Sequence, residues 1–161
     1  MKTLYLIRHA KAEEHSLSKS DFFRNLLPKG QERAKLISKE LANTLKVGEN
    51  TYVISSTANR AIQTAEIFCK ALAFPLTKVQ ETEHIYEAHF TAILKVINSV
   101  AKEYDHVLVF GHNPGLSNLI SYLSHAEVEL ATSHVAILQL EKGIDFSSLS
   151  GGTANLVGLL K

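Results

Sequence analysis

Apolar and polar residues follow two different patterns along this chain. Short, continuous apolar runs bounded by polar turns are typical of strands that are buried on both faces of a parallel sheet. Longer segments with an apolar residue at every third or fourth position predict helices that cover such a sheet. The predicted strands are residues 4–7, 52–54 and 106–110, and the predicted helices are residues 28–45, 61–72, 90–101 and 116–123.

The last part of the chain has a different pattern. Apolar runs at 135–140 and 154–160 predict two further strands, separated by glycine-containing turns. A short strand is also predicted at 76–79, directly after Pro75. Together these elements predict a three-layer α/β/α sandwich with a mainly parallel central sheet and an antiparallel edge strand. No linker or repeat interrupts the pattern, so residues 1–161 are predicted to form one domain.

Three of the predicted strands end in residues with the same kind of chemistry. The first strand runs into Arg8 and His9, the second leads to Arg60 at a helix start, and His112 follows closely after the strand at 106–110. Open α/β sheets place their ligands at the carboxyl ends of parallel strands. Helix starts at the same edge add N–H groups that attract an anion. The sequence therefore predicts a phosphate pocket that contains two histidines.

The residue types in this pocket suit phosphoryl transfer. A neutral imidazole can attack phosphorus, and arginines can hold the non-bridging oxygens whose charge must be stabilised. His9 is the predicted nucleophile, with Arg8, Arg60 and His112 around the phosphate. An exposed basic turn is the alternative for Arg8 and His9 taken alone, but the agreement of three strand ends favours a site. His134 is expected to be a bystander.

Composition removes several other classes of function. A formal charge of +1 gives no basic field, so no nucleic-acid partner is expected. No apolar stretch approaches bilayer length and no secretion signal precedes Arg8, so we expect no membrane partner and a cytoplasmic location. The single cysteine, Cys69, lies at helical spacing from the apolar residues Ala65 and Leu72. It is therefore expected to be a buried structural thiol.

Metal and nucleotide chemistry also lack sequence support. The eight histidines include no His-Glu-x-x-His pair and no Cys/His cluster at zinc spacing, so no metal site and no cofactor are predicted. The phosphate-binding pattern Gly-x-x-x-x-Gly-Lys-Ser/Thr is absent, which argues against a nucleotide hydrolase.

Four segments together resemble the histidine phosphatase superfamily, also called phosphoglycerate-mutase-like, and in particular its small phosphohistidine phosphatase branch of the SixA type. The resemblance covers nearly the whole chain and follows the family's motifs in order and spacing. The matching segments are Leu6–Ala10, Arg24–Gly30, Ser55–Ala65 and Gly111–Leu116.

This resemblance implies a role for each matching residue. His9 would carry the phosphoryl group, and Arg8, Arg60 and His112 would complete the phosphate pocket. Arg24 would be a further cation facing the phosphate. The resemblance also implies a proton donor in the region of Glu87, and Asn113 is a further phosphate-binding candidate in the turn after His112.

The resemblance implies a metal-independent phosphatase with a phosphohistidine intermediate. Its partners would be inorganic phosphate and a phosphorylated protein or small phosphorylated metabolite; no pattern sets the oligomeric state. The chain is too short for the substrate-covering insertions of phosphoglycerate mutases, which points to an open site suited to a protein-borne phosphate or to a broad range of small ones. A phosphohistidine protein is the preferred substrate. A broad small-molecule phosphomonoesterase is the first alternative. A non-catalytic phosphate-binding module is the second, because Ala10 stands where the family usually has glycine.

Overall fold

A computed structural model describes residues 1–161 and shows a single sheet between two layers of helices. The strands and α-helices, in chain order, are β1 (Thr3–Arg8), α1 (Pro28–Ala42), β2 (Thr51–Ser56), α2 (Asn59–Leu72), β3 (Gln80–Thr82), α3 (Phe90–Asn98), β4 (His106–Gly111), α4 (Gly115–Ser124), β5 (Val135–Leu140) and β6 (Ala154–Leu160). Short 3-10 turns include η1 (Asp21–Phe23), η2 (Leu76–Lys78), η3 (Glu83–Ile85) and η4 (Phe146–Ser148).

The six strands lie in the order β3-β2-β4-β1-β5-β6. The first four of these pair in parallel, whereas β5 and β6 run antiparallel to their neighbours. The prediction of a mainly parallel sheet with an antiparallel edge is therefore confirmed. Strand β4, predicted at 106–110, lies between β2 and β1, and residues 107–111 are all buried there.

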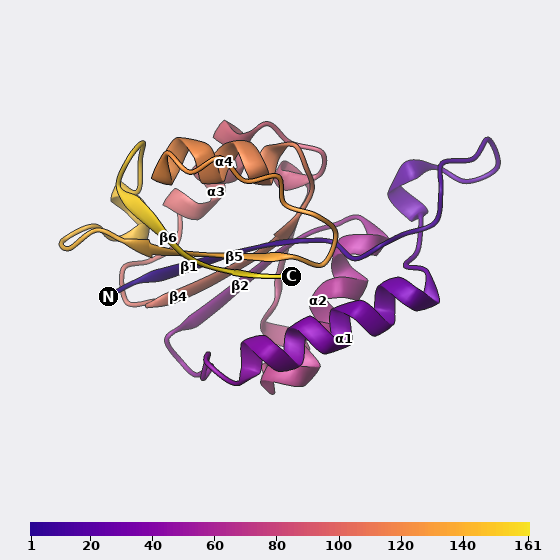
Figure 1. The fold of residues 1–161 in the computed structure, drawn as a ribbon, viewed down its shortest axis with the longest axis horizontal. Coiled ribbons are helices and arrows are strands. Elements are labelled where there is room, and N and C mark those ends of the chain that lie inside the picture. Colours follow the sequence, from indigo (N-terminus) through magenta and orange to yellow (C-terminus); the bar gives the residue numbers. More distant parts are fainter.

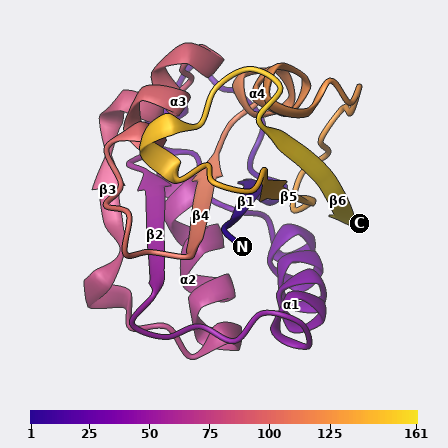
Figure 2. The same ribbon diagram turned by 90° about the vertical axis from the view of Figure 1, so that its left-hand side faces the viewer.

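Alternate residues of the central strands fill two separate cores. Leu4 and Leu6 pack with the α3 and α4 side of the sheet, whereas Tyr5 and Ile7 pack with the α1 and α2 side. Figures 1 and 2 show the two helix pairs on opposite faces of the sheet. Because both faces of β1 are covered, its side chains must be apolar throughout, and this requirement explains the unbroken run at 4–7.

Three sequence expectations differ from the structure in detail. The strand predicted at 76–79 is wrong, because residues 76–78 form a 3-10 turn and the strand begins at Gln80. The helix predicted over 28–45 ends at Ala42, although Leu45 is still buried in the same core as the helix. The helix predicted over 90–101 ends at Asn98, although Val100 is still buried. Leu45, Val100 and Val79 thus contact the cores without belonging to the expected elements, whereas Leu76 is exposed. No helix combines the length and the apolar character that crossing a bilayer requires.

The long polar segment between β1 and α1 extends past the sheet at the carboxyl end of β1 (Figure 1). Its two ends are held together, since the Leu27 N–H donates to the Lys11 carbonyl oxygen at 2.9 Å and Ala12 forms a bridge with Leu26. The first turn of α1 packs against the same backbone. A Cβ atom on Gly30 would lie 2.2 Å from the Lys11 carbonyl oxygen, so this contact requires glycine.

The Gly30→Ala substitution is expected to lower the free energy of unfolding by about 1–3 kcal/mol, because the added methyl meets backbone that cannot move aside. The gain in helix propensity, about 1 kcal/mol, works in the opposite direction and is smaller than the upper part of that cost. Urea unfolding would measure the difference. Gly48→Ala is the control, since its Cβ would lie no closer than 3.7 Å to any neighbouring atom. Equal stability of the two variants would contradict this account of Gly30.

Candidate functional site

The parallel pairing of β2, β4 and β1 brings their carboxyl ends to one edge of the sheet, as predicted. Arg8 pairs with Gly111, and the His9 N–H donates to the Gly111 carbonyl oxygen at 3.1 Å. The rings of His9 and His112 consequently lie with their centroids 5.3 Å apart. The two histidines that the sequence placed at separate strand ends thus form one pair.

The tautomer of His9 follows from its single hydrogen bond. Its Nδ1 lies 2.8 Å from the carbonyl oxygen of Ala10, which can only accept, so Nδ1 carries the proton. The lone pair is then on Nε2. Burial of the ring, which is 8% exposed, lowers the pKa of His9 to about 4, and the charges of Arg60, Arg8 and Arg24 act in the same direction. His9 is therefore a neutral imidazole at neutral pH, as its predicted role requires.

His112 is held by groups from two other segments. Its Nε2 lies 2.8 Å from the Ser56 hydroxyl, and its Nδ1 lies 3.3 Å from Glu87 Oε1 without hydrogen-bond geometry. Burial lowers the pKa of His112 to about 3, assisted by neighbouring His9 and by Arg60. Ser56 belongs to the polar end of β2, so that strand positions His112 as well as leading to Arg60.

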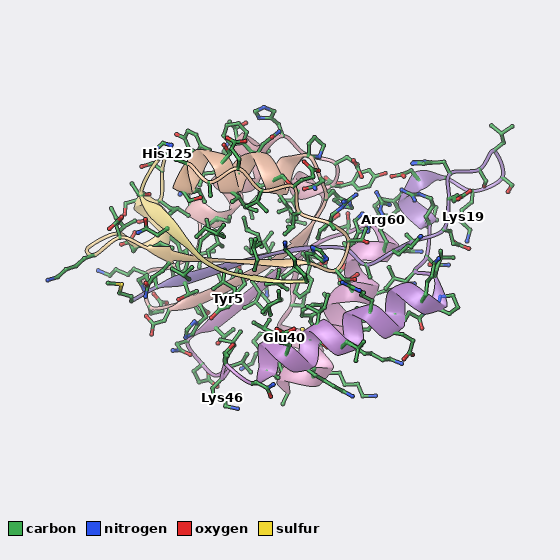
Figure 3. All side chains as sticks on the ribbon, viewed as in Figure 1. Tyr5, Lys19, Glu40, Lys46, Arg60 and His125 are labelled. Carbon is green, nitrogen blue, oxygen red and sulfur yellow. The ribbon has the colours of Figure 1, made fainter.

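Arg60 is 1% exposed and lies in the first turn of α2, with its guanidinium between two carboxylates. Its Nη2 donates to Asp21 Oδ2 at 3.0 Å and to Glu87 Oε1 at 2.6 Å, and its Nη1 donates to the Asp21 carbonyl oxygen at 2.8 Å. Figure 3 shows Arg60 at the sheet edge, on the side of the segment that carries Lys19. The Nε of Arg60 has no partner on the protein.

Asp21 is the residue that sequence reasoning missed. It accepts from Arg24 at 3.0 and 2.7 Å, from Arg60 and from the Tyr86 hydroxyl. Burial opposes ionisation of its carboxyl, but the hydrogen bonds from Tyr86 and Arg24 and the charge of Arg60 outweigh it and lower the pKa of Asp21. The only local signal was its spacing three residues before Arg24. Its pairing with Arg60 joins segments 39 positions apart and could not be inferred from spacing.

Arg8 and Arg24 both lie near the histidine pair but differ in what they contact. Arg8 donates to the Leu130 carbonyl oxygen at 3.1 Å, and its buried Nε has no protein partner. Arg24 is occupied by Asp21 and by the Glu13 carbonyl oxygen. Arg8 therefore keeps a free buried donor, whereas Arg24 mainly holds Asp21 in place.

Glu87 and Asn113, the last two predicted site residues, also differ in what they contact. Glu87 reaches both Arg60 and the vicinity of His112, in a backbone conformation with φ of 47°. The Asn113 amide is instead used within the fold: its nitrogen donates to the Leu130 carbonyl oxygen at 2.6 Å, and its oxygen accepts from the Ser117 N–H and hydroxyl. The structure brings Glu87 into the site and directs the Asn113 side chain to the start of α4.

Ala10 fits the position where the family usually has glycine. It is fully buried and is not among the residues with positive φ, so its side chain causes no backbone strain. The Ala10 N–H donates to the Thr64 hydroxyl at 2.9 Å, and that hydroxyl donates to the Arg60 carbonyl oxygen at 2.7 Å. Thr64 thus connects the backbone that carries His9 to the backbone that carries Arg60.

The sequence profile of the histidine phosphatase superfamily, branch 1, matches residues 4–106, which is more than half of the chain and includes His9, Arg60 and Glu87. The chain belongs to the histidine phosphatase superfamily. It is accordingly a phosphatase-class hydrolase with the phosphoglycerate-mutase-like fold. His112 lies beyond the matched stretch, so the profile match does not include it; the structure places it beside His9, as the strand ends predicted.

Several solved structures share this architecture. A protein from Agrobacterium tumefaciens that is provisionally described as phosphohistidine phosphatase SixA superposes with a TM-score of 0.81, at 22% identity over 99% of this chain and 97% of its own. The protein histidine phosphatase SixA bound to tungstate gives 0.81, at 21% identity over 99% and 96%. A phosphoserine phosphatase variant from Entamoeba histolytica bound to phosphoserine gives 0.65, at 15% identity over 100% and 98%. No curated protein matches the chain by sequence.

Two further residues were singled out in the sequence. Cys69 is fully buried, and burial raises the pKa of its thiol to about 12, which confirms the structural role predicted for it. His134 is half-buried outside the histidine pair. No group of three or more His, Cys, Asp or Glu side chains is arranged to hold a metal ion.

The low pKa of His9 predicts acid sensitivity. The unfolded chain protonates this histidine near pH 6.5, whereas the folded chain does so only near pH 4, so the folded state binds fewer protons and loses stability as the pH falls between these values. His9 should account for about 2 kcal/mol of the decrease in unfolding free energy between pH 7 and pH 5.

Urea unfolding at both pH values measures this decrease. His9→Gln is expected to show the smaller loss, while His84→Gln, at an exposed position, should keep that of the parent chain. An unchanged loss in His9→Gln would show that His9 is not buried in its neutral form.

Proposed function

We propose that this protein removes phosphoryl groups from phosphohistidine residues in proteins, through a phosphohistidine intermediate of its own on His9. The observation that carries the mechanism is the state of His9: a buried, neutral imidazole with its Nε2 lone pair free, 5.3 Å between centroids from His112. The buried Nε groups of Arg8 and Arg60, both without protein partners, supply donors suited to phosphate oxygens.

The reaction takes place in two displacements. In the first, the His9 Nε2 lone pair attacks phosphorus, the bond from phosphorus to the substrate nitrogen breaks, and the departing imidazole leaves as the neutral ring if that ring was protonated beforehand. In the second, a water oxygen attacks phosphorus, the bond to Nε2 breaks, and inorganic phosphate leaves with neutral His9 restored. Arg8, Arg60 and His112 stabilise the charge on the transferred group in both steps.

The short connections at this edge support a protein substrate. Only residues 57–58 separate β2 from α2, and only residues 112–114 separate β4 from α4. The longer segments, 9–27, 83–89 and 125–134, hold the site arginines: Asp21 and Glu87 accept hydrogen bonds from Arg60, and the Leu130 carbonyl oxygen accepts one from Arg8. Such an edge suits a phosphoryl group presented on the surface of another protein. The similarity to SixA structures supports the same substrate class.

A small-molecule phosphomonoesterase is the second candidate, and the position of Glu87 favours it. A carboxyl group beside His112 and Arg60 is placed where an acid could protonate an alkoxide leaving group. The similarity to a phosphoserine phosphatase is consistent with this reading.

The first test follows the phosphoryl group. Rapid-quench labelling is expected to find acid-labile, base-stable phosphate on His9, and His9→Ala should lose turnover by a factor on the order of a thousand or more while remaining folded. His84→Ala, at an exposed position, is the control and should retain activity. Near-normal turnover by His9→Ala would rule out this mechanism and would require another nucleophile. No turnover by the unmodified protein would leave a phosphate-binding module.

The second test separates the two substrate classes through Glu87. If Glu87 only orients Arg60 and His112, then Glu87→Gln should slow an alkyl phosphate and nitrophenyl phosphate by similar factors, because both lose the same support. We expect this result. If Glu87 is instead the proton donor, the alkyl phosphate should slow by about a hundredfold while nitrophenyl phosphate, with its good leaving group, changes little. That second outcome would favour the small-molecule phosphomonoesterase.

A further inference from the structure

A cavity of about 340 Å³ lies near the histidine pair and is lined by basic side chains. We call it the cation cleft. Lys11, Lys29, Arg33 and His134 provide the basic side chains, and no acidic side chain is among the lining residues. The remaining lining residues are Gly30, Ala131, Thr132 and Ser133.

The cation cleft shares backbone with the candidate catalytic site. Lys11 lies two residues after His9. The Ser133 N–H donates to the carbonyl oxygens of Arg8 and His9, at 3.1 and 3.2 Å, and the Arg8 N–H donates to the His134 carbonyl oxygen at 3.3 Å. Ser133 and His134 therefore attach the cleft lining to the backbone of Arg8 and His9, and Lys11 continues that backbone into the cleft.

The basic side chains of the cleft are not neutralised within the chain. Lys11, Lys29 and Arg33 are exposed and form no ion pair with any acidic residue of the chain. The close approach and like charge of Lys29 lower the pKa of Lys11, with a smaller opposing effect from Glu14. Since the whole chain carries only +1, this concentration of charge is a local feature of the fold.

The lining residue Ser133 is held in an energetically unfavourable arrangement. Ser133 is 1% exposed, has a φ of 69°, and its buried hydroxyl has no hydrogen-bond partner. A non-glycine residue in the left-handed region and a buried polar atom without a partner both cost free energy. On the opposite wall, Gly30 brings the first turn of α1 against the Lys11 backbone, so the N-terminal end of that helix dipole adds to the positive potential.

We infer that the cation cleft binds acidic side chains that flank the phosphohistidine on the substrate protein. This inference rests on the proposed function and adds a specificity determinant to it. Long, exposed lysine and arginine side chains suit carboxylates at variable positions on a protein surface, and they raise the rate of encounter with an acidic partner. A small metabolite would be better matched by fixed, buried donors such as those of Arg8 and Arg60.

The test uses two fluorescent peptides that carry phosphoryl-triazolylalanine, a non-hydrolysable mimic of phosphohistidine. One peptide has glutamate at every flanking position, and the other has glutamine. Fluorescence anisotropy at low ionic strength is expected to show about tenfold tighter binding of the glutamate peptide to the unmodified protein. The preference should fall below about threefold in the double variant Lys29→Gln/Arg33→Gln, and 0.5 M salt should abolish it.

Lys35→Gln/Lys39→Gln is the matched control, because it removes two charges from the same helix outside the cleft. It should keep the preference for the glutamate peptide and the parent rate with nitrophenyl phosphate. If both double variants lose the preference for the glutamate peptide to the same extent, the preference comes from net charge and the proposal is overturned. An undiminished preference in Lys29→Gln/Arg33→Gln would also overturn it.

Two further outcomes separate this inference from the proposed function. If nitrophenyl phosphate is hydrolysed but the protein does not distinguish the peptides, while binding of tripolyphosphate weakens in Lys29→Gln/Arg33→Gln, the cleft serves small polyanions and the protein-docking proposal fails. If the protein hydrolyses no phosphate ester or phosphohistidine, the proposed function fails. The anisotropy measurement then still decides whether the cleft binds acidic peptides.

Discussion

The parallel pairing of β4 with both β1 and β2 is the constraint on which the site depends. It aligns three strands so that Arg8 lies opposite Gly111 and Ser55 lies opposite Phe110. Side chains just beyond these strands must then share one edge. The two cores fix the alignment, because a shift of one residue would exchange the residues that face α1 and α2 with those that face α3 and α4. Packing free energy in the sheet thus holds the two histidines together.

The electrostatics of the site combine groups that are individually unfavourable in a buried position. Arg60 is almost fully buried, and Asp21 and Glu87 offset the desolvation of its charge by direct hydrogen bonds. The same arginine charges keep His9 and His112 neutral, in addition to the larger effect of burial. Asp21 also holds Arg24 and accepts from Tyr86, so one carboxylate organises cations from two segments. Under the proposed mechanism, the site presents positive charge to an incoming phosphate, and neutral His9 is the nucleophile for its phosphorus.

Positive charge at this end of the molecule is divided between two environments. The arginines near His9 are half-buried or buried and are fixed by hydrogen bonds, which suits an anion of defined geometry. The lysines and Arg33 of the cation cleft are exposed and carry no partners, which suits carboxylates of variable position. The backbone around the end of β1 joins the two regions, so recognition of a flanking acid and transfer of the phosphoryl group can occur on one substrate.

The sequence by itself determined the layers of the fold, the parallel centre, the presence of an antiparallel edge strand, and the convergence of Arg8, His9, Arg60 and His112. Each of these follows from local periodicity and from the rule that parallel strands end at one edge. Only the tertiary structure decided which groups surround them. The structure pairs Asp21 with Arg60, joins the Asn113 amide to the Leu130 carbonyl oxygen and gathers Lys11, Lys29, Arg33 and His134 in one cleft, and these contacts join segments far apart in the chain. Such contacts arise from how loops fold back over a sheet edge, and no spacing along a chain encodes that distance.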